Sequence, residues 1–216
     1  LLLDKLSGVT SNVAVQRVRR LFGRAKAGHT GTLDPLASGL LPICLGEATK
    51  FSSPLLEASK SYLAALRLGW HSSTGDAEGE LSEVAAPDFD QQALSDAIDA
   101  LSGPIEQVPP MYSAIKVNGR PLYSLARKGV NVERAPRRVH IHQLDVTGAS
   151  ENTLEIFVTC SKGTYVRVLA EDLGERLGCG AYLTALRRVA IGALQGSDAG
   201  GFDTLEDSTV EQRGAL

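Results

Sequence analysis

Several residue types are scarce in this 216-residue chain. Aromatic residues make up 5% of it, and it contains 3 cysteines, 1 methionine and 1 tryptophan. Cys44, Cys160 and Cys179 are odd in number and have no closely spaced partners, which argues against a disulfide framework and against a zinc knuckle. We therefore expect buried thiols.

Long apolar stretches are absent as well. No uninterrupted apolar run approaches the roughly 18 residues of a membrane-spanning helix, and residues 1–5 lack the layout of a signal peptide. These absences predict a soluble cytoplasmic protein with no membrane partner. The chain starts without a methionine inside an expected strand, Leu1 to Leu3, so we expect further N-terminal residues in the natural protein.

Ordinary globular composition is what remains. Apolar residues make up 43% and charged residues 22% of the chain, proportions that allow a sizeable core. A length of 216 residues predicts one large domain with an inserted subdomain. We find no internal repeat, phosphate-binding loop or dinucleotide fingerprint.

The charge is unevenly distributed. The net charge of −3 argues against a nucleic-acid partner, because affinity for phosphates comes mainly from Lys and Arg. A run without acids nevertheless carries five cations: Arg17, Arg19, Arg20, Arg24 and Lys26. Such a run is either a solvated face or a nucleic-acid contact, and both interpretations stay open here.

The stretch from Gly28 to Pro42, GHTGTLDPLASGLLP, has the character of an active-site loop. Glycines on either side of His29 and Thr30 permit sharp turns and close approach to a ligand. Asp34 followed by Pro35 is typical of a helix N-cap and first helical position. Asp34 is thus either a structural cap at the start of a short helix or a carboxylate fixed for chemistry.

Hydrophobic periodicity predicts an α+β fold. Ser11 is expected to cap a helix that ends at Gly23, and a second helix is expected from about Thr164, with Val166, Leu169 and Leu173 on its apolar face. The alternation of Leu186 and Arg188 on one side with Arg187 on the other predicts a strand. The expected strands are 1–3, 60–69, 138–146, 153–160 and 182–191.

Single residues leave several alternatives. Tyr62 is either a core aromatic or a stacking platform for a base. His140 and His142 share a strand face but lack a third ligand, so no metal site is predicted. Arg167 stands in the first turn of its helix, where the helix dipole disfavours a cation, and so predicts an anionic partner.

Prolines, tyrosines and cations alternate between Gln107 and Lys128. Asn118-Gly119 predicts a tight turn, and the residues from Leu122 to Gly129 predict a short basic helix. The segment is either an excursion that folds against RNA, with rings for bases and cations for phosphates, or an ordinary hairpin insert.

Four separated motifs together resemble one family. They are residues 28–42, Lys60-Ser61-Tyr62, Ser161-Lys162-Gly163-Thr164-Tyr165-Val166-Arg167 and Leu186-Arg187-Arg188, and in this order they resemble the bacterial TruB-type tRNA pseudouridine synthases, which isomerise uridine-55 in the T loop. The resemblance implies one catalytic domain over 1–216, built on a mixed, largely antiparallel central sheet flanked by helices. It also implies an RNA-gripping insert near 104–135 and a C-terminal PUA domain that this chain stops too soon to contain.

The resemblance assigns roles residue by residue. Asp34 becomes the catalytic carboxylate, Tyr62 the ring that stacks on the target base, and Arg167 the ion-pair partner of Asp34. The remaining positions become substrate contacts: His29 in the loop entering the T arm, Tyr165 and Leu186 in the base pocket, and Lys5, where the family reads Lys-Pro and this chain has Leu6.

The implied chemistry needs little else. Breaking a glycosidic bond and rejoining the base through C5 is started by a carboxylate, so we expect no cofactor and no metal. The expected partner is the tRNA T stem-loop, with Lys50, Lys116 and Arg127 as further RNA-contacting cations and no obligate protein partner, the protein acting as a monomer. Extruding the uridine costs a few kcal/mol, to be recovered by stacking on Tyr62 and by phosphate contacts.

Two other functions remain open at this point. A related synthase that works within a guide-RNA particle would share the catalytic motifs but differ in residues 108–123. A non-catalytic RNA-binding module would use Asp34 only as a helix cap. Release of the C5 hydrogen from tRNA, without guide or added metal, separates all three.

Overall fold

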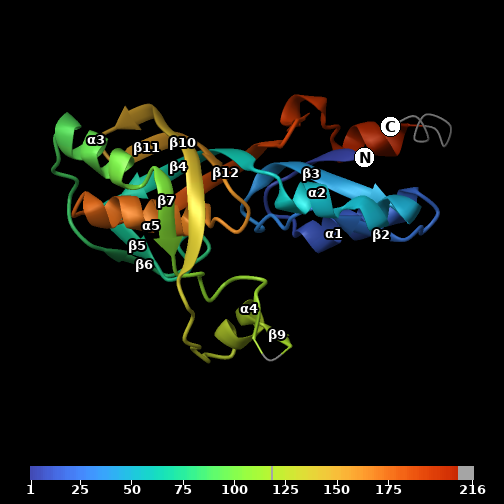
Figure 1. Ribbon diagram of the computed structural model, residues 1–216, viewed down its shortest axis with the longest axis horizontal. Helices are drawn as coiled ribbons and strands as arrows, with labels where there is room; N and C mark the ends of the chain where they lie inside the picture. The colour runs from blue at the N-terminus through green and yellow to red at the C-terminus, as the bar shows by residue number, and fades with distance from the viewer. Residues whose placement is uncertain (118, 209–216) are drawn as a thin grey trace. The chain divides into compact units, whose positions relative to one another are not determined.

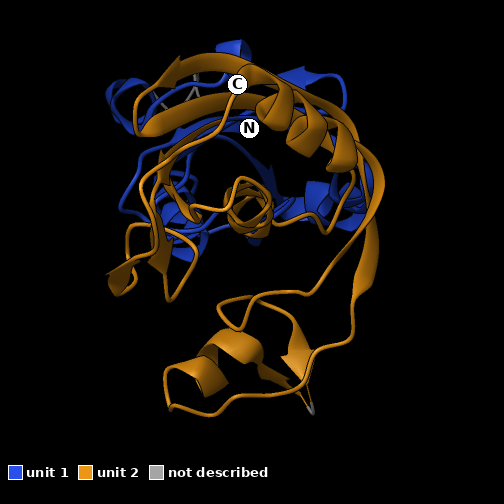
Figure 2. Cartoon of the chain, turned by 90° about the vertical axis from the view of Figure 1, so that its left-hand side faces the viewer, with its two compact units in different colours: residues 1–63, 185–216 blue, residues 64–184 orange. Residues whose placement is uncertain are grey.

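The computed structural model describes residues 1–117 and 119–208, and the chain divides into two compact units (Figures 1 and 2). Unit 1 comprises residues 1–63 and 185–216, and unit 2 comprises residues 64–184. Strands β4 (Lys60–Leu68) and β12 (Ala181–Ile191) each contribute residues to both units. We describe each unit separately.

Unit 1 contains the N-terminal strands and both chain ends. The helices of this unit contact its strands, α1 against β2 and β3 and α6 against β1. Its core includes Leu3, Val18, Leu40, Leu41 and Ile43, each at most 1% exposed. The elements wholly within unit 1 are β1 (Leu2–Lys5), α1 (Ser11–Leu21), β2 (Ala27–His29), β3 (Ser38–Leu45), η1 (Gly46–Phe51), α2 (Ser53–Glu57), β13 (Leu194–Gln195), η2 (Gly196–Asp198) and α6 (Phe202–Asp207).

Helix α1 follows its sequence signal closely. Ala14, Val15 and Val18 are buried at helical spacing, which buries one apolar stripe. The cap is Thr10, whose side chain accepts a hydrogen bond from the Val13 amide at 3.2 Å, so the prediction of Ser11 was wrong by one residue. Ser11 is buried, and its hydroxyl accepts a hydrogen bond from the Leu33 amide of the neighbouring loop instead.

Unit 2 is built around strands β10 and β11 and helix α5. Leu154, Ile156, Val158 and Cys160 are buried on β11, which confirms the predicted alternation. Its other elements are β5 (Trp70–Ser72), β6 (Leu81–Glu83), α3 (Gln91–Ala100), β7 (Gly103–Gln107), β8 (Lys116–Val117), β9 (Arg120–Pro121), α4 (Leu122–Ala126), β10 (Arg137–Ser150), β11 (Thr153–Cys160) and α5 (Val166–Arg176).

Helix α5 packs closely on the start of β12. A Cβ on Gly174 would lie 2.1 Å from the backbone nitrogen of Ala181, so only glycine permits this approach. Val166, Leu169 and Leu173 are buried, as the periodicity predicted. Arg167 follows Val166, the first residue of the helix, and is therefore fixed by the best-packed helix of this unit.

The main sheet confirms the predicted fold class. In the described residues its hydrogen-bonded order is β1-β3-β12-β4-β11-β10-β7, with β2 beside β3 and β13 beside β12. β12 and β3 run parallel, whereas β1 with β3, and β10 with both β11 and β7, run antiparallel. The fold is α+β with a mixed, largely antiparallel sheet.

The segment between β7 and β10 is an excursion from unit 2, as Figure 2 shows. The short strands β8 and β9 pair antiparallel and lead into α4, as the predicted hairpin and short helix require. Asn118 of the predicted Asn118-Gly119 turn lies outside the described residues.

Candidate active site

The loop that carries Asp34 contains no helix. Residues 33–37 form neither helix nor strand, with bends at Pro35 and Leu36, and lead directly into strand β3. The predicted helix cap was therefore wrong: the Asp34 carbonyl accepts one turn bond, from the Ala37 amide at 3.1 Å, and the chain then extends. The Asp-Pro pair predicted a helix here, but hydrogen bonds from residues distant in sequence stabilise a different backbone conformation.

These bonds fix the loop on both sides of Asp34. The Ser11 hydroxyl accepts from the Leu33 amide at 2.8 Å and donates to the Leu33 carbonyl at 3.0 Å. On the other side, the Gly8 amide donates to the Pro35 carbonyl at 2.8 Å. The Asp34 backbone is thus held at both neighbouring residues.

Lys5 is also directed at this loop. It is 0% exposed, and its Nζ donates to the carbonyls of Leu6 at 2.9 Å, Val9 at 2.6 Å and Pro35 at 3.4 Å. A buried ammonium is retained only where acceptors compensate for its lost hydration. The structure thus gives the predicted substrate contact Lys5 a position inside the protein, where it ties residues 5–9 to the Asp34 loop.

Tyr62 and Arg188 meet within unit 1. Arg188 is 1% exposed and donates a side-chain hydrogen bond to Tyr62. Burial lowers the pKa of Arg188, while the charge and hydrogen bond of Tyr62 oppose that shift. Leu186 is buried on the same side of β12, as the alternation predicted.

His29 lies half-buried beside this group. Burial lowers the pKa of His29, and the charge of Arg188 lowers it further. The Gly31 amide donates to His29 Nδ1 at 3.4 Å, which requires Nδ1 to be the unprotonated nitrogen. The imidazole is therefore neutral at neutral pH.

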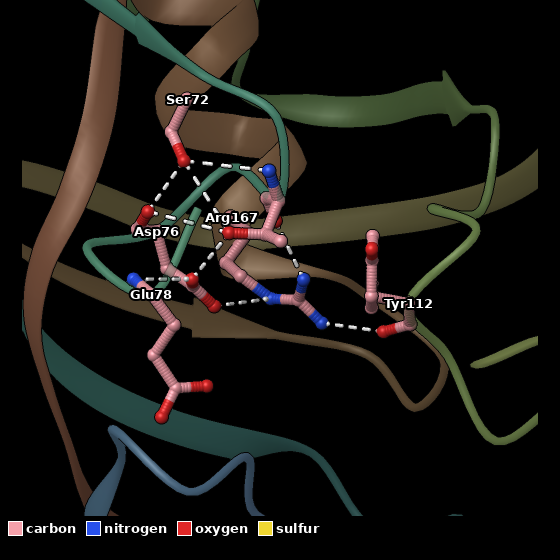
Figure 3. Close-up of polar contacts among 6 residues, drawn as sticks. Ser72, Asp76, Glu78, Tyr112 and Arg167 are labelled. Atoms are coloured by element: carbon pink, nitrogen blue, oxygen red, sulfur yellow. Dashed lines mark hydrogen bonds and ion pairs between the residues drawn. The ribbon is translucent and has the colours of Figure 1, made fainter. Parts of the chain in front are cut away.

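Arg167 in unit 2 contacts two backbone carbonyls and a carboxylate (Figure 3). It is 3% exposed, and it donates to the carbonyls of Thr74 at 2.7 Å and Tyr112 at 2.8 Å. Its Nε lies 3.5 Å from Oδ2 of Asp76, and both side chains are 4% exposed. The predicted anionic partner of a cation at this helix start is thus present in unit 2.

Sequence reasoning missed Asp76. Its Oδ1 accepts from the Thr74 hydroxyl at 2.6 Å and from the Glu78 amide at 3.1 Å, which leaves Oδ2 toward Arg167. The only available signal was an acid within a Gly-rich turn, Ser73-Thr74-Gly75-Asp76, and that pattern is typical of surface turns.

Two carboxyl groups on α5 have raised pKa values. Burial raises the pKa of Glu171 to about 7, opposed by the charge of Arg167. Burial likewise raises the pKa of Asp172 to about 6, assisted by Glu175. Glu171 lines a cavity of about 370 Å³ together with Thr74 and Tyr112, whose carbonyls hold Arg167.

The N-terminus of α5 is fixed by a neighbouring strand. The side chain of Gln107 accepts from the Tyr165 amide at 3.0 Å and donates to the Tyr165 carbonyl at 3.3 Å. Tyr165 is half-buried directly before Val166. Its predicted role in the base pocket remains a prediction.

The three predicted phosphate contacts are exposed. Lys50 pairs with Glu47 at 2.6 Å, and the Arg127 guanidinium lies 5.6 Å from the centre of the Tyr123 ring. Lys116 lies on β8 within the excursion. All three side chains are exposed, as a contact to the phosphate backbone of RNA requires. Their role in binding RNA stays a prediction.

The predicted catalytic residues are divided between the units. Asp34 and Tyr62 belong to unit 1 and Arg167 to unit 2, so their convergence on one uridine remains a prediction. Within residues 1–117 and 119–208, no cluster of three or more His, Cys, Asp or Glu side chains suits a metal ion. No helix in that same part of the chain has the length and apolarity to cross a membrane.

Comparison with known proteins identifies the family. The model of the TruB family pseudouridylate synthase N-terminal domain matches residues 19–166, more than half of the chain. The chain belongs to the TruB family. The model of the tRNA pseudouridylate synthase B C-terminal domain matches residues 167–215.

Curated relatives agree with this family. The chain is 57% identical to tRNA pseudouridine synthase B of Cupriavidus taiwanensis over 221 residues, covering 100% of this chain and 70% of that protein. It is 56% identical to the protein of the same name from Dechloromonas aromatica, covering 90% of this chain and 65% of that protein.

A solved structure gives the same fold. The structure described as a Cbf5-Nop10-Gar1 complex contains a chain that matches with a TM-score of 0.77 and 27% identity, covering 100% of this chain and 56% of that one. The TruB family and this structural likeness together support the predicted pseudouridine synthase fold.

Proposed function

We propose that this chain isomerises uridine to pseudouridine in tRNA, at position 55 of the T loop. The observation that carries the proposal is the 57% identity to a tRNA pseudouridine synthase B over the whole chain. The chain spans 65% of the length of one such relative and 70% of another, so the activity of this part is what needs testing.

Asp34 is the proposed catalytic group. The backbones of its neighbours Leu33 and Pro35 are hydrogen-bonded to Ser11, Gly8 and Lys5, so the backbone that carries the carboxylate is held before substrate arrives. Such preorganisation favours reaction because little reorganisation is left to the transition state.

The reaction conserves every atom of the nucleotide. The bond from C1′ to N1 of uracil breaks, the base turns, and a bond from C1′ to C5 forms. C5 then gives up its hydrogen as a proton, and N1 takes up a proton. The proposed role of Asp34 is to start this sequence as a nucleophile or as a charge-stabilising group.

Arg167 is the proposed partner of Asp34. The guanidinium is planar and has five donors, so it can keep its contacts to Thr74, Tyr112 and Asp76 while donating to a second carboxylate. Asp76 acts through Arg167 in this scheme, as a positioning residue.

Tyr62 is the proposed stacking ring. The extruded uracil loses its stacking in the RNA, at a cost of a few kcal/mol, and an aromatic platform recovers part of that cost. The exposed cations Lys50, Lys116 and Arg127 supply sequence-independent attraction to phosphates.

Tritium release from a tRNA transcript labelled at C5 of uridine tests the proposal, with the site mapped by carbodiimide modification and primer extension. We expect release without guide RNA and a single pseudouridine at position 55, and none from a transcript with cytidine at 55. Pseudouridine at another position would refute the assignment to 55. Release only with a guide RNA would favour a guide-dependent synthase, and binding without release would favour a non-catalytic module.

A further inference from the structure

Arg188 is 1% exposed, among the most deeply buried charged residues of the described chain, and its guanidinium donates to two backbone carbonyls. Its Nε donates to the Leu40 carbonyl at 2.8 Å, and its Nη2 donates to the Gly31 carbonyl at 3.1 Å. Burying a guanidinium is costly unless its N–H groups are satisfied. The backbone on both sides of Asp34 provides that satisfaction.

The two carbonyls lie on opposite sides of Asp34 in the chain. We call residues 30–37, between β2 and β3, the Asp34 loop. Gly31 precedes Asp34 by three residues, and Leu40 is the third residue of β3. One rigid fork therefore sets the distance between the start of the loop and the strand that follows it. A lysine in this position has a single nitrogen and lacks the fixed spacing of two donors.

Glycines make room for this arrangement. A Cβ on Gly31 would make an ordinary contact with Nη1 of Arg188, at 3.5 Å, but the φ of +130° at Gly31 disfavours any other residue. A Cβ on Gly39 would lie 2.3 Å from the Arg188 carbonyl oxygen, and Gly39 has a φ of +96°, which disfavours any other residue. The loop is thus shaped around β12 and the guanidinium.

The same guanidinium donates to Tyr62 on β4. Tyr62 is neither in the loop nor adjacent to it in sequence, yet the loop and the Tyr62 hydroxyl share one buried cation. The orientation of the ring and the path of the loop are consequently coupled through a single side chain.

We propose that Arg188 is a positioning residue that fixes the Asp34 loop relative to the ring of Tyr62. The proposal rests on the proposed function for its catalytic consequence. Arg188 touches no reacting atom in this scheme. It holds the carboxylate loop and the stacking ring in one mutual arrangement, so its loss misaligns them without removing either.

Substitution Arg188→Lys tests the proposal, because the charge stays and the fork is lost. We expect kcat for tritium release to fall by roughly 10- to 100-fold, the scale of a misplacement of about 1 Å, with KM changed by less than about threefold. Amide exchange at Leu33 and Ala37 should accelerate, while exchange in α1 stays as in the wild type. Unchanged kcat together with unchanged exchange at these two amides would overturn the proposal.

Arg187→Lys is the matched control on the same strand. Arg187 is half-exposed and makes a bidentate ion pair with Asp4, at 3.0 and 2.7 Å. We expect kcat to change by less than about twofold, as for most surface substitutions. An equal loss in both variants would show that any arginine change on β12 has this effect, and would contradict a specific role for Arg188.

A second variant covers the case in which Arg188→Lys does not fold. Tyr62→Phe keeps the ring and removes the acceptor of Arg188, so amide exchange at Leu33 should accelerate although Tyr62 lies outside the loop. Unchanged exchange there would overturn the coupling. A wild-type protein that releases no tritium would refute the proposed function, whereas the exchange measurements would still decide the link between Arg188, Tyr62 and the loop.

Discussion

The Asp34 loop of unit 1 and the Arg167 group of unit 2 are held in different ways. The loop is fixed through its backbone, by Ser11, Lys5 and Arg188. Arg167 is fixed through its own side chain, by two carbonyls and by Asp76. Asp34, the proposed reacting group, is thus positioned through the backbone around it, whereas Arg167, its proposed partner, is held by contacts to its own side chain.

Asp34→Asn should have the largest effect, because it removes the reacting carboxylate and leaves every backbone anchor of the loop in place. We expect tritium release to fall on the order of 10⁴-fold, the scale found when a catalytic acid is removed from a preorganised site. RNA binding and the urea midpoint should remain near the wild-type values. Substantial turnover by this variant would show that the loop is held for another purpose.

Arg167→Lys comes next, because it keeps the charge and loses the fork. A lysine cannot reach Thr74, Tyr112 and Asp76 together, so we expect kcat to fall by roughly 10²- to 10³-fold, as when one oriented donor is lost. Single-turnover tritium release measures the effect. A rate like that of the wild type would mean that charge alone matters in unit 2.

Asp76→Asn should be milder, because both carbonyl contacts to Arg167 survive. We expect kcat to fall about 10-fold, less than the 10²-fold of a misplacement of about 1 Å, with KM little changed. Glu78→Gln is the matched control, since the backbone amide of Glu78 that donates to Asp76 is kept in this variant. An effect as large as that of Arg167→Lys would indicate that Asp76 does more than orient the guanidinium.

Glu171 in unit 2 and His29 in unit 1 should contribute to the pH dependence of stability with opposite signs. The pKa of Glu171 is raised from 4.5 to about 7, so the folded state binds its proton more tightly and this contribution is lost as pH rises from 4.5 to 7. The pKa of His29 is lowered from 6.5, so its contribution is lost as pH falls below 6.5.

Thermal melting between pH 5 and 8 separates these contributions. Glu171→Gln should raise Tm more at pH 7.5 than at pH 5, because the wild-type carboxyl must ionise in a buried position at the higher pH. Asp172→Asn provides a comparison, because the pKa of Asp172 is raised from 3.8 to about 6 and its gain in Tm should be complete at a lower pH than that of Glu171→Gln. A Glu171→Gln gain that is equal at both pH values would contradict the raised pKa.

The smallest effects should come from the exposed cations. Lys50→Ala and Arg127→Ala should each weaken tRNA binding severalfold and reduce the slope of log K against log salt concentration by about 1. We expect kcat to be unchanged at saturating RNA. Filter binding at several salt concentrations measures this. A fall in kcat without a change in salt dependence would place these residues nearer the chemistry than we propose.

Local sequence signals predicted the elements with strong periodicity. The alternation in β11 and the apolar stripe of α5 depend on neighbours in sequence, and both were confirmed. The Asp34 helix did not form, because the Pro35 and Leu36 carbonyls, which a helix beginning at Pro35 would have used, accept instead from the Gly8 amide and the Ser7 hydroxyl.

The supporting residues of the site were not predictable in this way. Asp76 pairs with Arg167, which is distant in sequence, and Arg188 lies 157 residues from its acceptor Gly31. No periodicity or turn signal carries such pairings, because they arise only when the sheet brings distant segments together. Family resemblance supplied Asp34, Tyr62 and Arg167, and the contacts that hold them came from the structure.

The most direct test is a crystal structure of this protein with a T stem-loop RNA, in which the distance between the Asp34 carboxylate and the Arg167 guanidinium is measured. Our account predicts an ion pair with N and O atoms within about 4 Å, with uridine-55 stacked on Tyr62 beside it. A bound uridine on Tyr62 with Arg167 turned away and more than about 8 Å from Asp34, beyond the reach of a direct pair, would contradict it.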